Sequence, residues 1–313
     1  MKKLIALLAV LVVSIASIAA YASTNSSPEG TAEDPVEEFE PTSVYCYMGL
    51  DKIRKDDTKN NDMVLLAQFD HDRKEIKTVS VYRKTLMELD DEVMELNKAY
   101  SIDGAKSVVD MLESNLDLDV EGYIASEYDS SIKILSLLDG IEEDIDADFV
   151  ESANKFIDEM NEAYGYSASH IEAGEQKLNG VQVIGYARAL DKEKNDIERA
   201  DHDRDLMKKI REAYNRADEE TKENIIELVL SELYTDMNEG EIEKLAGYIK
   251  DYKIADETGF PEYRKDGEDD SVRVVPDDLE KNVVWLHEYF GEDPYEASDD
   301  VKEISKDIEE SID

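Results

Sequence analysis

Two groups of acidic and arginine residues have the composition of a site for a charged ligand. The first group contains Asp51, Asp62 and Arg83, and the second contains Arg188 and Arg199. Carboxylate and phosphate oxygens are the ligands that Mg²⁺ prefers, and arginine is suited to bidentate binding of phosphate. The sequence therefore favours a site for a metal ion together with an anionic group.

A predicted β-hairpin brings part of the first group together. Segments 44–48, 63–69 and 76–82 are short, apolar and bounded by turn residues, which is typical of strands. The polar segment 70–75 has the length of a hairpin connection. If residues 70 and 75 pair, the register places Asp62 opposite Arg83, with Asp51 at the same open end of the sheet. An ordinary cross-strand ion pair is the alternative that these residues leave open.

The composition is strongly acidic and excludes one class of partner. The chain has 313 residues, with 78 Asp and Glu against 35 Lys and Arg, and a net charge of −43. Because nucleic-acid binding depends on neutralising phosphates with Lys and Arg, we expect no nucleic-acid partner. Cys46 is the one cysteine, so no internal disulfide forms, and we expect it to be a small buried hydrophobic residue.

The chain divides into four segments. Residues 1–22 have a basic start, an apolar run and a small-x-small pattern at Ala22, which predict an export signal or a signal anchor. Residues 23–42 are polar and predicted to be a disordered stalk. A folded domain over 43–290 follows, and 291–313 is an acidic tail in which we expect a frayed helix over 301–312. Cleavage near Ala22 and retention as an anchor both place the domain outside the cytoplasm.

Helical periodicity follows the three strands. The spacing of apolar residues predicts helices over 105–114, 130–138, 147–163, 219–237 and 241–252, with a last helix that Pro276 opens. Early strands combined with many helices predict an α/β fold, a single domain with a central mixed β-sheet flanked by helices, plus C-terminal helices.

Several short motifs, in order, resemble those of the LytR-CpsA-Psr family of cell-envelope proteins. Each motif is weak alone, but their order and spacing together are fairly specific. The resemblance covers about residues 44–290, most of the folded part. The motifs are Gly49-Leu50-Asp51, Asn61-Asp62-Met63, Ser80-Val81-Tyr82-Arg83-Lys84, Leu96-Asn97-Lys98-Ala99-Tyr100, Leu178-Asn179-Gly180, Tyr186-Ala187-Arg188 and Val275-Pro276-Asp277.

The resemblance implies a transferase outside the cytoplasmic membrane. Family members move a glycopolymer from a polyprenyl-pyrophosphate carrier to the cell wall with Mg²⁺, so the implied partners are the lipid-linked glycopolymer, peptidoglycan and the membrane surface. The family's metal-binding aspartates fall on Asp51 and Asp62, and its pyrophosphate-binding arginines on Arg83, Arg188 and Arg199. Arg83 and Asp62 are the residues implied to be catalytic.

Departures from the family pattern support an alternative. Lys84 stands where the family has Asp, Tyr82 where it has Pro, and Leu190 where it has a second Arg. His202 and Asp203 replace an expected Arg and Gln, and Asn60 replaces an Arg. The alternative is a degenerate member that binds a polyprenyl phosphate or wall polymer without catalysis. A third interpretation is a secreted acidic interaction protein.

Other candidate residues are weaker. His71, His170 and His287 have no spacing typical of a metal site, and the acidic run 142–148 lacks the pattern of a calcium loop, so a solvated surface is favoured there. Arg264 is expected to lie outside the cleft.

Overall fold

A mixed sheet forms the centre of the molecule. The computed structural model describes residues 41–51, 60–189, 196–265 and 273–312. Among these residues the central sheet has six strands in the order β10-β3-β2-β1-β6-β9. Their bounds are β10 Lys253–Phe260, β3 Glu75–Val81, β2 Asn60–Asp70, β1 Thr42–Asp51, β6 Val120–Glu127 and β9 Tyr234–Thr235. Pairs β1–β2, β2–β3 and β6–β9 are antiparallel, and pairs β1–β6 and β10–β3 are parallel.

Strand β1 is buried on both faces. Tyr45 and Tyr47 belong to one hydrophobic cluster, whereas Cys46 and Met48 belong to the other. This alternation follows from the two-residue period of a strand. Burial also raises the pKa of the Cys46 thiol, so the residue is the buried hydrophobe that we expected.

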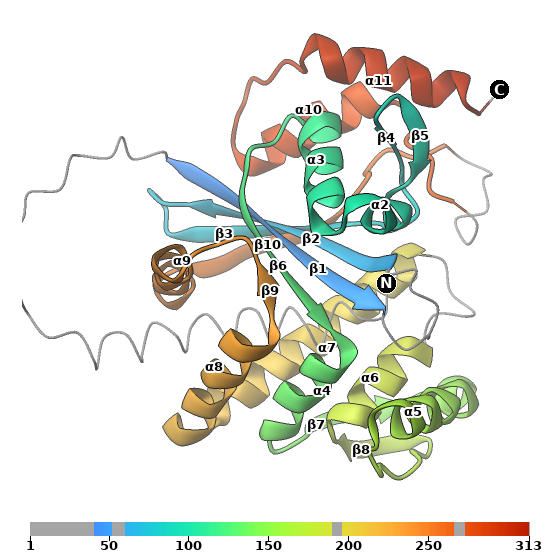
Figure 1. The fold of residues 1–313 in the computed structure, drawn as a ribbon, viewed down its shortest axis with the longest axis vertical. Helices are drawn as coiled ribbons and strands as arrows, with labels where there is room; N and C mark the ends of the chain where they lie inside the picture. The colour runs from blue at the N-terminus through green and yellow to red at the C-terminus, as the bar shows by residue number, and fades with distance from the viewer. Residues whose placement is uncertain (1–40, 52–59, 190–195, 266–272, 313) are drawn as a thin grey trace, which may run out of the picture.

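Helices cover both faces of the sheet (Figure 1). One face carries α2 Leu96–Asp103, α3 Ala105–Leu116, α10 Leu279–Phe290 and α11 Asp299–Glu310. The other face carries the remaining helices: α4 Tyr128–Leu137, α5 Val150–Tyr164, α6 Gly180–Ala189, α7 Asp196–Arg216, α8 Glu219–Glu232 and α9 Glu239–Asp251. A short 3₁₀ turn, Ala147–Phe149, precedes α5. Two small antiparallel sheets complete the fold: the hairpin of β4 Leu86–Leu89 with β5 Glu92–Glu95, and the pair of β7 Ile141–Ile145 with β8 Gly174–Leu178, which α5 separates in sequence.

The predicted α/β class with a central mixed sheet is confirmed, and two helix boundaries are corrected. The helix predicted over 219–237 ends at Glu232, because Tyr234 and Thr235 pair with the edge of β6 as β9. Pro276 does not open the last helix. That helix, α10, begins at Leu279, where the side chain of Asp278 accepts a hydrogen bond from the backbone N–H of Lys281.

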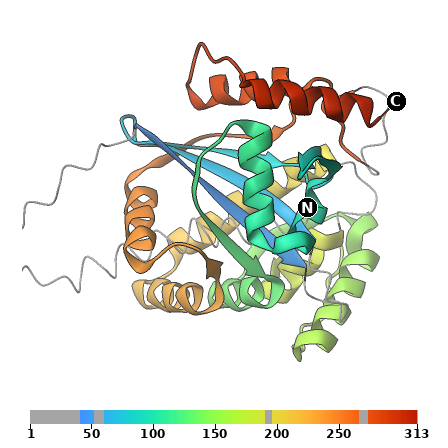
Figure 2. The ribbon, with the colours of Figure 1, turned by 45° about the horizontal axis from the view of Figure 1, so that its top comes forward.

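The acidic C-terminal segment is not frayed. Helix α11 packs beside α10 and against α3 and β4, as Figures 1 and 2 show. Its residues Val301, Ile304 and Ile308 are all buried. The helical spacing of these residues was therefore predicted correctly, but the segment belongs to the folded domain.

The predicted export signal over 1–22 and the predicted stalk over 23–42 lie outside the described residues, apart from the last two positions of the stalk. Within the described ranges, no helix has the length and apolar character needed to cross a membrane.

Because α11 is packed against the domain, its buried residues should contribute to the free energy of unfolding. Ile308 is 2% exposed, so Ile308→Ala should lower the free energy of unfolding by about 2–4 kcal/mol through lost burial and a residual cavity. Ile102, in α2, is 53% exposed, and Ile102→Ala should stay within about 0.5 kcal/mol. Urea unfolding of both variants measures the difference. Equal, small effects would mean that α11 does not contribute to the fold.

Candidate functional site

Four strands of the sheet end at the same edge. Strand β3 is antiparallel to β2, which is antiparallel to β1, so β1 and β3 run in the same direction. Strands β6 and β10 are parallel to β1 and β3, respectively. The carboxyl ends of β1, β3, β6 and β10 therefore meet at one edge, here called the carboxyl edge. Ligands of open α/β sheets commonly bind outside the carboxyl ends of the strands.

Arg83 occupies a tight turn at the carboxyl edge. The backbone N–H of Thr85 donates to the carbonyl oxygen of Tyr82 at 2.9 Å, which closes a turn with Arg83 and Lys84 at its centre. This β-turn, residues 82–85, is here called the Arg83 turn. The side chains of Arg83 and Lys84 are both half-buried.

Three separate elements hold the backbone of the Arg83 turn. The N–H of Tyr82 donates to the carbonyl of Phe260 in β10 at 3.0 Å. The carbonyl of Arg83 accepts from the N–H of Asn97 in α2 at 2.7 Å, and that of Lys84 accepts from the N–H of Val274 at 2.9 Å. A turn fixed at successive residues by different elements has little freedom to change direction, so Arg83 leaves the sheet in a defined direction.

The same helix end holds the start of β2. Asn61 is fully buried, and its amide, oriented to donate, lies 3.2 Å from the carbonyl oxygens of both Leu96 and Asn97. Asn97 also donates to Arg83. The Leu96-Asn97 motif thus joins the two strand ends that bear Asp62 and Arg83, which gives this motif a structural role.

Asp62 lies at a β-bulge. Gly49 pairs with Met63 and Leu50 pairs with Asn61, so Asp62 is the extra residue of β2 opposite the Gly49–Leu50 step. Bulges redirect side chains and are frequent beside active sites. Asp51 pairs with Asn60, two residues before Asp62 in β2, so the two aspartates lie diagonally near each other on adjacent strands.

The predicted hairpin register is confirmed. Residues Asp70 and Glu75 pair, and the same register continues to Val64 and Val81. The paired residues end at Val64 and Val81, so the predicted pair of Asp62 with Arg83 is not part of the ladder: Asp62 lies in the bulge and Arg83 in the turn. The side chains of Asp51 and Asp62 lie outside the described part of the chain, so their convergence on a metal ion stays a prediction. Among the described side chains, no group of three or more His, Cys, Asp or Glu residues is arranged to hold a metal.

Helix α6 is packed closely between α4 and α5. A Cβ atom at Gly180 would lie 2.5 Å from the carbonyl oxygen of Ile132 in α4, and one at Gly185 would lie 2.6 Å from Cγ1 of Ile157 in α5. Asn179 and Gln182 exchange hydrogen bonds between side chain and backbone N–H at 2.9 and 3.1 Å, which caps the start of the helix. These contacts leave α6 little room to shift or rotate.

The close packing of α6 places Arg188 in an aromatic and acidic environment. Its guanidinium carbon lies 4.1 Å from the ring centre of Phe156 and 5.0 Å from that of Tyr128. One guanidinium nitrogen is 3.7 Å from a carboxylate oxygen of Glu159, and the side chain is 12% exposed. Tyr128 directly follows Glu127, the partner of Leu50 in β1, so Arg188 lies beside the carboxyl edge.

The structure therefore brings four of the five predicted positions to one edge. Asp51, Asp62 and Arg83 lie on strand ends, and Arg188 approaches from the helical layer. Arg199 lies in α7, but its side chain is outside the described residues. Figure 1 shows the carboxyl end of β1 between α2 on one face and the helices α4 and α6 on the other.

Arg264, expected to lie outside the cleft, has its guanidinium carbon 5.7 Å from the ring centre of Tyr82, the residue before Arg83. The sequence also did not identify the roles of Asn61, Asn97, Tyr128 and Phe156. The motifs that contain Asn61 and Asn97 were the available signal for those two residues.

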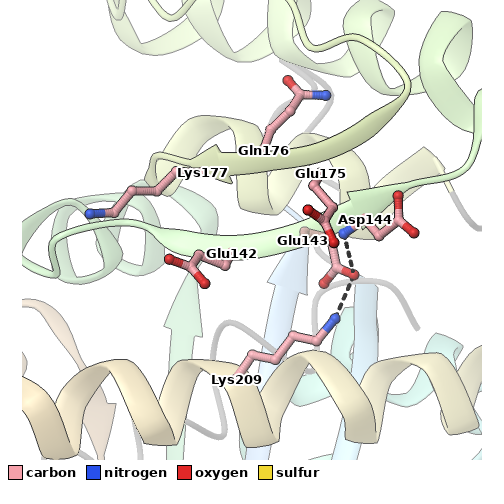
Figure 3. A pocket seen from close by; sticks show the side chains of 7 residues that line it. All are labelled: Glu142, Glu143, Asp144, Glu175, Gln176, Lys177 and Lys209. Carbon is pink, nitrogen blue, oxygen red and sulfur yellow. Dashed lines mark hydrogen bonds and ion pairs between the residues drawn. The ribbon is translucent and has the colours of Figure 1, made fainter.

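A groove lies elsewhere, between the two-stranded β7–β8 sheet and α7 (Figure 3). It has a volume of about 540 Å³, and its lining includes Glu142, Asp144 and Glu175. Lys209 and Glu143 form an ion pair at 2.6 Å across it. Glu142 and Asp144, from the acidic run, are exposed, in agreement with the expected solvated surface.

The histidines with described contacts serve packing and hydrogen bonding. His287 is buried; its Nε2 donates to the carbonyl oxygen of Leu116, and its Nδ1 lies 2.8 Å from a carboxylate oxygen of Glu292. His71 is buried in the hairpin connection, with its ring nitrogens 2.9 Å from the hydroxyls of Ser43 and Tyr252. Burial lowers the pKa of His71.

Comparisons with known proteins agree with the motif resemblance. The model of the LytR_cpsA_psr family matches residues 11–273. The chain is 26% identical over 173 residues to polyisoprenyl-teichoic acid–peptidoglycan teichoic acid transferase TagV of Bacillus subtilis (strain 168), covering 53% of this chain and 42% of that protein. It is 25% identical over 235 residues to biofilm regulatory protein A of Streptococcus mutans, covering 70% and 56%. The chain thus spans about half the length of these curated relatives.

Solved structures share the fold. Protein gbs0355 from Streptococcus agalactiae has a TM-score of 0.61 at 18% identity, covering 82% of this chain and 90% of that one. TagT bound to LIIa-WTA has a TM-score of 0.58 at 14% identity, with coverages of 83% and 94%. TagV of B. subtilis has a TM-score of 0.55 at 20% identity, with coverages of 82% and 100%. At these identities the matches support the fold and no finer property.

The close packing of α6 makes a prediction about Gly185. Gly185→Ala should lower the free energy of unfolding by about 1–3 kcal/mol, because the added methyl group overlaps Ile157. The matched control is Gly240→Ala in α9, where the nearest atom to a new Cβ is 3.4 Å away. A helical Gly→Ala change without overlap is neutral or stabilising by about 0.5–1 kcal/mol. Chemical denaturation compares them, and a neutral Gly185→Ala would contradict the packing described here.

His71 makes a prediction about pH. Its pKa in the folded state is below the ordinary value of 6.5, so the unfolded chain binds a proton more readily. The stability that neutral His71 contributes is therefore present above pH 6.5 and is lost as the pH falls through its lowered pKa. The charged groups around it are Glu121, Asp70 and Asp72, which raise the pKa, and Lys244, which lowers it.

Urea unfolding between pH 7 and 5 tests this expectation. The free energy of unfolding of His71→Gln should depend less on pH than that of the unmodified protein. His170→Gln is the control, because His170 is exposed and contacts Asp158 at the surface. Identical pH dependence of all three proteins would rule out a contribution from His71.

Proposed function

This chain belongs to the LytR_cpsA_psr family, and from that premise we propose that it is an extracytoplasmic transferase. The proposed reaction attaches a glycopolymer from a polyprenyl-pyrophosphate carrier to the cell wall, with peptidoglycan as the acceptor. The observation that carries this proposal is the Arg83 turn, which presents an arginine at the carboxyl edge on a backbone fixed by three elements.

The described residues fit the binding of a pyrophosphate. Arg83 offers a planar guanidinium that can bind two phosphate oxygens at once, and its fixed backbone reduces the entropy lost on binding. Arg188 is largely shielded from water beside Phe156, and shielding strengthens its attraction for an anion. Phosphoryl transfer requires positioning and charge neutralisation more than a strong nucleophile, and these residues supply both.

Mg²⁺ is the proposed cofactor. Asp51 and Asp62 occupy neighbouring positions on β1 and β2, and two carboxylates are a usual protein contribution to a Mg²⁺ site that also binds substrate phosphates. When bound there, the ion would neutralise charge on the pyrophosphate. The bulge at Asp62 supports this assignment, because bulges redirect side chains beside active sites.

The placement outside the cytoplasm rests on the sequence of residues 1–22. Cleavage near Ala22 would give a secreted protein, and retention would give a membrane-anchored one. Either form has access to a lipid carrier at the membrane surface.

A second candidate function is binding without catalysis. Lys84 occupies the second central position of the Arg83 turn, where the family has Asp. This exchange adds a cation that attracts phosphate and removes a carboxylate that could hold a metal or accept a proton. A degenerate family member that retains a polyprenyl phosphate or wall polymer would have this combination.

Arg83→Ala tests the proposed binding site. It should weaken Mg²⁺-dependent binding of a short polyprenyl pyrophosphate by on the order of 2–5 kcal/mol, if the ion pair with phosphate is desolvated. The control is Arg73→Ala, in the β2–β3 connection at the opposite edge, where the side chain is 69% exposed and pairs with Asp70. Arg264 is unsuitable as a control because it contacts Tyr82.

Turnover with the same lipid separates the candidates. Binding with release or transfer of phosphate supports the transferase, and binding without turnover supports the second candidate. Equal, small effects of Arg83→Ala and Arg73→Ala on binding would refute the placement of the site. No binding by the unmodified protein would favour the acidic interaction protein.

A further inference from the structure

We propose that Tyr82 is a positioning residue that orients Arg83 through a matched contact with Gly259 of β10. The inference rests on the proposed function for its consequence in binding, whereas the contact itself is a feature of the fold. Tyr82 stands where the family resemblance leads one to expect proline, and the structure uses both properties that tyrosine has and proline lacks.

The first property is the backbone N–H. Tyr82 donates it to the carbonyl of Phe260 at 3.0 Å. Phe260 also pairs with Val81, so this hydrogen bond extends the contact between β3 and β10 to the first residue of the Arg83 turn. Proline has no N–H and could not make it.

The second property is the aromatic ring. A Cβ atom at Gly259 would lie 2.3 Å from the hydroxyl oxygen of Tyr82 and 2.7 Å from its Cζ. The ring therefore lies directly against the backbone of Gly259, and only glycine leaves room for it. Glycine weakens a strand because it has no side chain to pack. In an outer strand of the sheet such as β10, an aromatic ring packed over the glycine from the neighbouring strand can replace the missing contacts.

Arg264 contacts the same ring. Its guanidinium carbon lies 5.7 Å from the ring centre, and its Nη1 donates to the carbonyl of Pro261 at 2.7 Å. Tyr82 is 4% exposed, so its ring cannot move into solvent without losing these contacts. Tyr82 is thereby held through its backbone by Phe260 and through its ring by Gly259 and Arg264.

The contacts of Tyr82 affect the orientation of Arg83, the next residue. The direction in which Arg83 leaves the sheet depends on the backbone of Tyr82, because that residue begins the turn. Moving the ring away from Gly259 should shift the first residue of the turn and with it the direction of Arg83, while the hydrogen bonds from Asn97 and Val274 to the carbonyls of Arg83 and Lys84 keep the domain folded. Tyr82 and Gly259 thus form a pair whose fit decides the orientation of Arg83.

Two substitutions disrupt the contact, one at each residue of the pair. Gly259→Ala inserts a methyl group against the ring, and Tyr82→Leu removes the ring while keeping an apolar side chain. Tyr82→Phe is the conservative variant, since it keeps the ring and removes the atom closest to Gly259. Gly240→Ala is the control for a Gly→Ala change away from the site. Circular dichroism and thermal melting establish that each variant is folded.

The first readout needs no lipid. Phenylglyoxal modifies accessible arginines, and mass spectrometry of the Arg83 peptide gives the rate at Arg83. Gly259→Ala and Tyr82→Leu should each raise that rate severalfold, whereas Tyr82→Phe and Gly240→Ala should leave it unchanged. In the double variant Gly259→Ala/Tyr82→Leu the effect should equal that of Tyr82→Leu alone, because the overlap is gone.

The second readout is binding of a short polyprenyl pyrophosphate with Mg²⁺. The two disruptive variants should bind about tenfold more weakly, a change of ~1.4 kcal/mol, and Tyr82→Phe should bind normally. An unchanged modification rate in Gly259→Ala and Tyr82→Leu, or fully additive effects in the double variant, would overturn the inference. If the unmodified protein binds no lipid pyrophosphate, the proposed function fails, while the modification rates still decide the role of Tyr82. If Gly259→Ala does not fold, the modification rates of Tyr82→Leu and Tyr82→Phe are compared instead, and equal rates overturn the inference.

Discussion

The shared direction of β1, β3, β6 and β10 is the constraint on which the candidate site depends. Backbone hydrogen bonds fix that direction, and they bring the ends of four strands to one edge although the strands are distant in sequence. Reversing any one of these strands would carry its final residues to the opposite edge. Burial of β1 on both faces makes a shift of register costly, because a one-residue slip exchanges the side chains of the two hydrophobic clusters.

Many motif residues at this edge support other residues and are not available to bind a ligand. Asn61 is fully buried against the start of α2, and the N–H of Asn97 is used by Arg83. Gly180 allows α6 to approach α4 closely, which fixes the helix that carries Arg188. The motifs therefore combine a few charged residues with the backbone contacts that orient them.

The carboxyl edge lies far from the point where the chain enters the domain. Strand β1 has ten residues, so its ends are about 30 Å apart at ~3.3 Å per residue. If residues 1–22 anchor the protein, the segment before Thr42 must let the domain turn this edge toward a lipid headgroup. A polar stalk of the kind predicted over 23–42 would permit that movement, whereas a short connection would hold the edge away from the membrane.

Local sequence determined the elements whose signal is local. The strands β1, β2 and β3 and the register of β2 with β3 were predicted from apolar runs and a hairpin-length connection. The helical spacing of Val301, Ile304 and Ile308 was also visible in the sequence, but their burial against the domain was not. Helix α6 gave no clear period, because it is buried on nearly all sides. The charged residues and their order were visible in the sequence. The distant partners of the Arg83 turn were not visible, because Phe260 and Val274 lie 178 and 190 positions from the residues they bond and contribute only backbone atoms, which side-chain patterns do not reveal. The side-chain contact of Arg264 with the ring of Tyr82 was also not predicted, because tertiary structure alone brings these two residues together.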